Sequence, residues 1–173
     1  GVAQDGRSLV GSLAISTTDY NDGRLDAGIS RQSSKLFAEA LIAGVTRDLS
    51  FEYSTWARRY LWDRNYSETR LPEVPSAILE TLSHQNFPDM MLAQDPNFKF
   101  SIARSIYKTI NRYVNDMHGH ASVIQPLPPR NLSVEPKGDG KAQISWNLQE
   151  DKQEPSSYPD CYILYTATGT SGF

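Results

Sequence analysis

The chain has 173 residues, of which 39% are hydrophobic and 21% are charged, so it can bury a core and is not of the disordered class. Its formal net charge of −3 at pH 7 excludes the broad basic surface of a nucleic-acid-binding protein, and no apolar run is long enough to cross a bilayer. The single cysteine, Cys161, excludes an internal disulfide and a metal site built from several cysteines.

The first 121 residues alternate between segments typical of strands and segments typical of helices. The predicted elements are, in chain order, a buried strand at 9–16, an amphipathic helix at about 29–49, a strand at 76–82, a short helix at 89–94 and a long helix at about 96–117. Asp95 followed by Pro96 is the start signal of the long helix, with an acidic cap and a proline in the first helical position. This alternation is typical of an α/β fold, an open sheet that is covered by helices.

Residues 50–70 are rich in aromatic and basic side chains without a sustained period, so we expect an irregular excursion over the surface, with room for one helical turn. Trp62 and Arg70 are its two candidates for contact with a carbohydrate ligand. Aromatic faces stack on sugar rings, and guanidinium groups pair with carboxylates. A structural role, in which the same side chains pack the excursion onto the sheet, fits the sequence equally well.

The pattern changes after residue 121. Residues 122–129 form a proline-rich linker that favours an extended conformation. Residues 130–173 then alternate polar with apolar side chains, which predicts the first strands of an all-β, immunoglobulin-like sandwich. Those strands are expected at 131–134, 142–146 and 161–166, with a turn at 137–140, Trp146 in the core and Cys161 as a small core side chain.

The strand at 76–82 carries a carboxylate, Glu80, near its end, and polar side chains follow it closely. Burying a carboxylate without partners costs several kcal/mol, so its position indicates either a catalytic acid or an acid that backbone donors hold. His84 and Asn86 leave the strand at the same exit, where α/β sheets place their sites. His84 fits a substrate contact and a plain polar loop residue equally well.

The run PSAILET that begins at Pro75, with Asn86, Asp89 and Leu92 after it, resembles the C-terminal half of zinc-dependent N-acetylmuramoyl-L-alanine amidases. The later part of the same pattern comprises Asp95, Pro96, Phe98, Ile102, Ala103 and Ile106. The resemblance covers about residues 1–117. One departure is Leu82-Ser83, where the family usually has Gly-Phe.

The resemblance implies a hydrolase that cuts the amide between N-acetylmuramic acid and L-alanine in peptidoglycan. In this family a zinc ion held by two histidines and a glutamate activates water, and a second glutamate at the end of the hydrophobic strand acts as general base or acid. Glu80 occupies the position of that second glutamate. The family often has an arginine in the loop before this strand, which favours Arg70 as a substrate contact, together with Trp62, His84 and Asn86.

The zinc ligands of the family lie upstream of the portion that this chain resembles, and no histidine precedes His84. The chain begins at Gly1 without an initiator methionine and ends directly after an apolar run. We therefore expect a fragment of a longer bacterial protein that is periplasmic, secreted or on the cell surface. The intact protein would hold zinc, whereas the fragment alone would hold no metal and be inactive.

The tail resembles the first strands of a fibronectin type III domain, through PRNLSV from Pro129, the Ser145-Trp146 pair and YPDCYILY from Tyr158. The expected partner is peptidoglycan or another cell-wall glycan. Two alternatives stay open at this point. One is a secreted, xanthan-lyase-like protein that degrades polysaccharides, and the other is a catalytically degenerate module that binds the cell wall.

Overall fold

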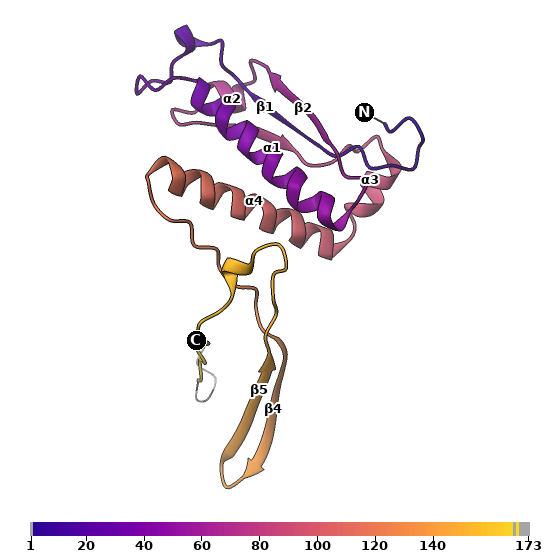
Figure 1. The fold of residues 1–173 in the computed structure, drawn as a ribbon, viewed down its shortest axis with the longest axis vertical. Coiled ribbons are helices and arrows are strands. Elements are labelled where there is room, and N and C mark those ends of the chain that lie inside the picture. The colour runs from indigo at the N-terminus through magenta and orange to yellow at the C-terminus, as the bar shows by residue number, and fades with distance from the viewer. Residues whose placement is uncertain (1, 168, 170–173) are drawn as a thin grey trace. The chain divides into compact units, whose positions relative to one another are not determined.

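A computed structural model describes residues 2–167 and residue 169 (Figure 1). The chain divides into two compact units, Gly1–Ser122 and Val123–Phe173. The division falls at the start of the segment predicted as a linker, and residues 122–129 contain neither helix nor strand.

The first unit is built on a small mixed sheet. Its strands are β1 (Ser12–Ser16), β2 (Arg58–Asp63) and β3 (Ile78–Glu80), in the order β2-β1-β3. β1 pairs in parallel with β2 and antiparallel with β3. Every residue of the central strand β1 is buried, whereas the two edge strands are only partly covered.

Helix α1 (Gln32–Glu52) is the crossover that the parallel pair β1 and β2 requires, and it lies across the sheet (Figure 1). Ala38 and Ile42 of α1 pack on Ala14 of β1, and the neighbouring Leu61 and Leu79 join the same cluster. The sheet residues that face α1 are therefore small or aliphatic. By strand alternation, the residues between them point to the opposite face.

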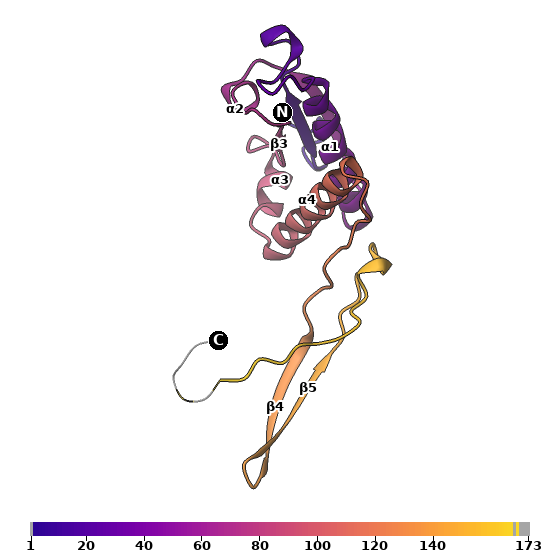
Figure 2. The ribbon, with the colours of Figure 1, turned by 90° about the vertical axis from the view of Figure 1, so that its left-hand side faces the viewer.

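Helix α4 (Pro96–Met117) packs along α1, as Figures 1 and 2 both show, and the cluster that its Phe98 and Ile102 form with α1 also contacts Leu79 of β3. Asp95 caps it by accepting a hydrogen bond from the backbone nitrogen of Asn97 at 2.8 Å, as the sequence predicted. The helices approach closely at Gly44, where a Cβ atom would lie 2.0 Å from Thr109 Oγ1. Beside this contact, the buried side chains of Lys108 and Asp48 form an ion pair at 3.1 Å.

Two short helices complete the first unit, α2 (Ser67–Arg70) after β2 and α3 (Phe87–Leu92) after β3. In the second unit, β4 (Arg130–Gly138) and β5 (Lys141–Asn147) form an antiparallel hairpin. Its turn contains Gly138, Asp139 and Gly140, all with positive φ, as expected of a tight hairpin turn. The ring of Trp146 meets that of Tyr162 edge-on at 5.2 Å.

The structure confirms the α/β class and most helices, but three sequence predictions are wrong. Residues 50–70 are not an irregular excursion, because they contain the strand β2; the helical turn for which this segment left room is α2. Residues 161–166 form no strand, and Cys161 is exposed. β3 is shorter than predicted and only half-buried, because it is an edge strand.

Gly11, immediately before β1, allows the close approach of the segment that leads into β2. Its φ is +81°, and a Cβ atom built there would lie 1.9 Å from the backbone oxygen of Ala57. Because that obstacle is backbone, it cannot rotate away as a side chain can. Any side chain at position 11 must therefore displace the start of β1 from β2.

We expect Gly11→Ala to lower the free energy of unfolding of the first unit by about 3 kcal/mol or more, from backbone strain plus the clash. Gly28→Ala is the matched control, since Gly28 also has positive φ (+78°) but nothing within 4 Å of the added atom. The control should lose only about 1–2 kcal/mol. Urea denaturation followed by circular dichroism compares them, and equal losses would contradict the close contact.

Candidate functional site

Glu80 is the last residue of β3 and pairs with Leu13 of β1. Its neighbour Leu79 packs toward α1, so Glu80 points to the opposite face of the sheet. Its side chain is exposed. Among the described residues, its carboxylate has no hydrogen-bond or ion-pair partner. The expectation of a buried strand end was wrong, and Glu80 is a free carboxylate open to solvent.

The turn that follows Glu80 is held rigidly by Asp89, the third residue of α3. Asp89 is completely buried. Its Oδ1 accepts from the backbone nitrogen of Val10 at 2.8 Å, and its Oδ2 accepts from the backbone nitrogen of Ser83 at 2.8 Å. A buried carboxylate with several N–H donors is well stabilised, and here it joins the turn to the segment before β1.

Asn86 belongs to the same network and is also completely buried. Its Oδ1 accepts from the backbone nitrogen of Ala3 at 3.1 Å, and its Nδ2 donates to the backbone oxygen of Ser8 at 3.1 Å and to Asp89 Oδ1 at 2.8 Å. Its amide group is thus used within the protein. We call this network the Asn86–Asp89 clamp. The sequence analysis predicted that Asn86 contacts substrate, whereas in the structure its side-chain amide positions the turn.

His84 lies in the clamped turn with an exposed side chain, four residues after Glu80. Within the part of the chain that the structure describes, no three His, Cys, Asp or Glu side chains come together in a way that could hold a metal ion. The residues present therefore do not form the zinc site that the amidase resemblance implies. No metal-dependent step can be assigned to them.

Trp62 lies on β2 and pairs with Ile15, on the same face of the sheet as Glu80. Because Glu80 pairs with Leu13 on the other side of β1, strand spacing and rise put the two Cα atoms about 12 Å apart. Trp62 stacks on Tyr60, with ring centroids 5.4 Å apart and planes at 13°. These two candidate residues therefore share one sheet face without touching.

Arg70 lies elsewhere, at the end of α2. Its neighbour Thr69 shares a buried hydroxyl–hydroxyl hydrogen bond of 2.7 Å with Thr17, which follows β1. Glu80 pairs with Leu13, four residues before Thr17. Along the direction of β1, Glu80 and Thr69 are therefore about 13 Å apart, the rise of four extended residues. Arg70 donates to Asn65 Oδ1 at 3.0 Å, and its guanidinium lies 5.4 Å from the centre of the Tyr20 ring. The structure does not bring Arg70 together with Glu80.

Neither the burial of the Asp89 carboxylate nor the strand that carries Trp62 was predicted from the sequence. The spacing of Asn86 and Asp89 before a short helix was visible in the sequence. Their burial was not, because it depends on residues 3–10 lying against the turn.

No family model, no curated protein and no solved structure matches this chain. None of the described helices is both long and apolar enough to cross a membrane.

We expect Asp89→Ala to lower the free energy of unfolding by about 3 kcal/mol or more, because it leaves the buried donors of Val10, Ser83 and Asn86 without an acceptor, each at a cost of about 1–3 kcal/mol. Hydrogen exchange should show faster exchange at the amides of Val10 and Ser83. Asp116→Ala, which removes an exposed carboxylate, is the control and should change neither. Unchanged protection of both amides in Asp89→Ala would rule out the clamp.

Proposed function

We propose that the first unit is part of a peptidoglycan hydrolase, an N-acetylmuramoyl-L-alanine amidase, in which Glu80 transfers the proton. The observation that carries the proposal is the position of Glu80. It is an exposed, unpartnered carboxylate at a strand end, on the sheet face away from α1, followed by a turn that the Asn86–Asp89 clamp holds.

This geometry suits amide hydrolysis. Cleavage requires a group that takes a proton from the attacking water and gives one to the departing nitrogen, so that the sugar keeps a carboxyl group and the peptide leaves with L-alanine at its free amino terminus. A carboxylate without internal partners is free to do both. The clamp contributes by fixing where β3 ends, since general acid–base catalysis requires hydrogen-bond contact with the reacting atoms.

The proposal places the zinc ligands of such an enzyme outside residues 1–173, in a longer bacterial protein that is exported to the periplasm or the cell surface. The partner would be peptidoglycan or another cell-wall glycan. The β4–β5 hairpin would then belong to a fibronectin-like module that serves as a spacer or as a glycan-binding accessory.

A second candidate function is favoured by one specific observation, the stacked aromatic and basic side chains on β2. They suit an acidic polysaccharide, either as the substrate of a lyase or as the ligand of a non-catalytic wall-binding module. Product analysis separates these possibilities. Amidase action releases L-alanine amino termini, a lyase creates an unsaturated sugar that absorbs in the ultraviolet, and a binding module produces neither.

The test is Glu80→Gln in the full-length protein that carries this chain. We expect release of L-alanine amino termini from peptidoglycan to fall by at least about 100-fold, because general acid–base catalysis contributes about that much. Zinc content and melting temperature should not change. Glu73→Gln, which alters an exposed glutamate in the preceding loop, should retain full activity. Retained turnover in Glu80→Gln would contradict the proton-transfer role of Glu80.

A further inference from the structure

The edge strand β2 contains a bulge that changes the direction of its side chains. Ser12 of β1 pairs with Arg58, but the pairing of Ala14 is with Leu61, so β2 has one residue more than β1 over this stretch. An extra residue bends a strand and re-aims the side chains beside it. Here the Arg59 guanidinium lies 5.9 Å from the centre of the Tyr60 ring, although the two residues are adjacent in sequence.

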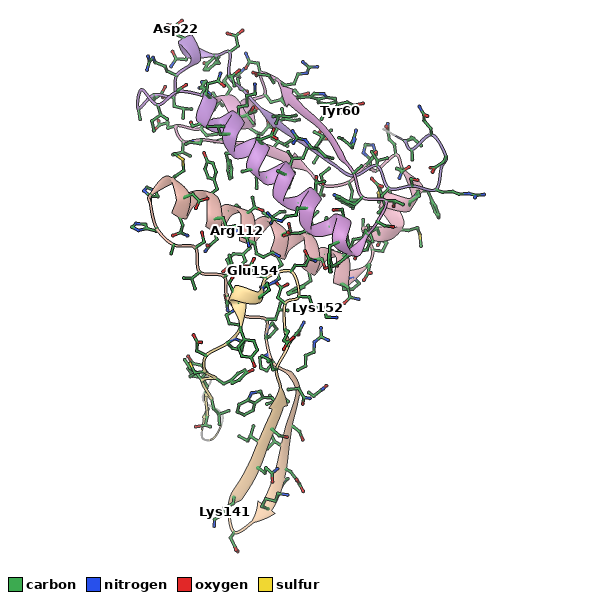
Figure 3. The ribbon with its side chains drawn as sticks, in the orientation of Figure 1. Asp22, Tyr60, Arg112, Lys141, Lys152 and Glu154 are labelled. Carbon is green, nitrogen blue, oxygen red and sulfur yellow. The ribbon has the colours of Figure 1, made fainter. Side chains whose placement is uncertain are left out.

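Four side chains form a continuous stack along this strand, in the order Arg59, Tyr60, Trp62 and Arg64, which we call the β2 stack. The guanidinium of Arg64 lies 5.6 Å from the centre of the Trp62 ring, whose other neighbour is Tyr60. Figure 3 shows Tyr60 projecting at the edge of the sheet, and its side chain is 56% exposed. Trp62 therefore lies between Tyr60 and Arg64, and flat stacking of a sugar on its ring is obstructed.

The outer members of the stack, Arg59 and Arg64, are cations without a counterion among residues 2–167 and 169. Arg58 is engaged by Glu39, through two hydrogen bonds of 2.5 and 2.8 Å, and this bonding lowers the pKa of the Glu39 carboxyl. Asp63 accepts from the backbone nitrogen and the hydroxyl of Thr18. By contrast, no carboxylate of the described residues lies within ion-pair distance of Arg59 or Arg64.

We propose that the β2 stack is a binding surface for the carboxylate groups of an acidic polysaccharide. Stacking on an aromatic ring favours a fixed orientation of each guanidinium, and a planar fork held in place recognises a carboxylate with two parallel hydrogen bonds. The charge complementarity between the two arginines and the carboxylates of the ligand is local, because the chain as a whole carries a net charge of −3. The proposed binding therefore does not depend on a general attraction of the chain for polyanions.

The bulge also favours a polysaccharide over an acidic peptide as the occupant. An extended peptide binds a sheet edge through a regular ladder of backbone hydrogen bonds, and the bulge between Arg58 and Leu61 interrupts that ladder. Recognition at β2 then depends on side chains. The surface is independent of the proposed role of Glu80, which lies beyond β1 on the other edge strand.

The test measures binding of the 173-residue chain to polygalacturonate by isothermal titration calorimetry, with two ligand controls. Fully methyl-esterified polygalacturonate has the same sugar backbone without charge, and polyglutamate is an acidic peptide. We expect binding to polygalacturonate, at least about tenfold weaker binding to polyglutamate, and loss of binding to the methyl ester.

The variant that tests the residues is Arg59→Gln/Arg64→Gln, which should weaken polygalacturonate binding by at least about tenfold. Arg7→Gln/Lys99→Gln is the matched control, because it removes the same charge from exposed basic side chains of the first unit that lie outside the stack. Arg59→Lys/Arg64→Lys keeps the charge but loses the planar fork, so it should bind more weakly than the unaltered chain. Glu80→Gln should bind normally, which separates this surface from the catalytic proposal.

Four outcomes would overturn the inference, in variants whose circular dichroism shows intact folding. They are no binding of polygalacturonate, equal binding of its methyl ester, equal losses in the two glutamine double variants, or tighter binding of polyglutamate. The third result would show that only net charge matters, and the fourth would identify the surface as an acidic-peptide site.

Discussion

The packing of the first unit depends on helix α1, which buries two of its faces at once. One face, around Ala38 and Ile42, covers Ala14 of the central strand, and another, around Val45 and Leu49, meets Phe98 and Ile102 of α4. Small side chains make both contacts close, with Ala38 against the sheet and Gly44 against Thr109. The burial of this apolar surface is the main stabilising term of the first unit.

The structure contrasts two carboxylates that lie close together in the chain. Asp89 is buried and used completely by backbone and amide donors, whereas Glu80 is exposed and has no partner among the described residues. The first organises the turn and the second is available for chemistry. This division of labour is the physical basis for assigning a positioning role to Asp89 and a proton-transfer role to Glu80 in the proposed amidase.

The two edge strands of the sheet expose different chemistry. β3 ends in the carboxylate of Glu80, and β2 carries the arginine and aromatic side chains of the β2 stack. An edge strand in a soluble protein often carries charges and a bulge that discourage pairing with other chains. In β2 the same features also hold two guanidinium groups against aromatic rings, and in the described part of the chain no carboxylate neutralises them.

Local sequence determined several features of this protein by itself. The cap Asp95 and Pro96 start α4, the turn around Asp139 forms the hairpin, and apolar spacing places α1, because capping, turn geometry and helical period depend on neighbouring residues. The existence of β2 and the burial of Asp89 were decided by tertiary structure. β2 forms because its backbone pairs with β1, far away in the chain, and its bulge hides the alternation that a strand normally shows. The candidate site followed the same division: Glu80 was visible as an acid at a strand end, but its exposure and its distance from Arg70 depend on strand order and direction, which no local pattern encodes.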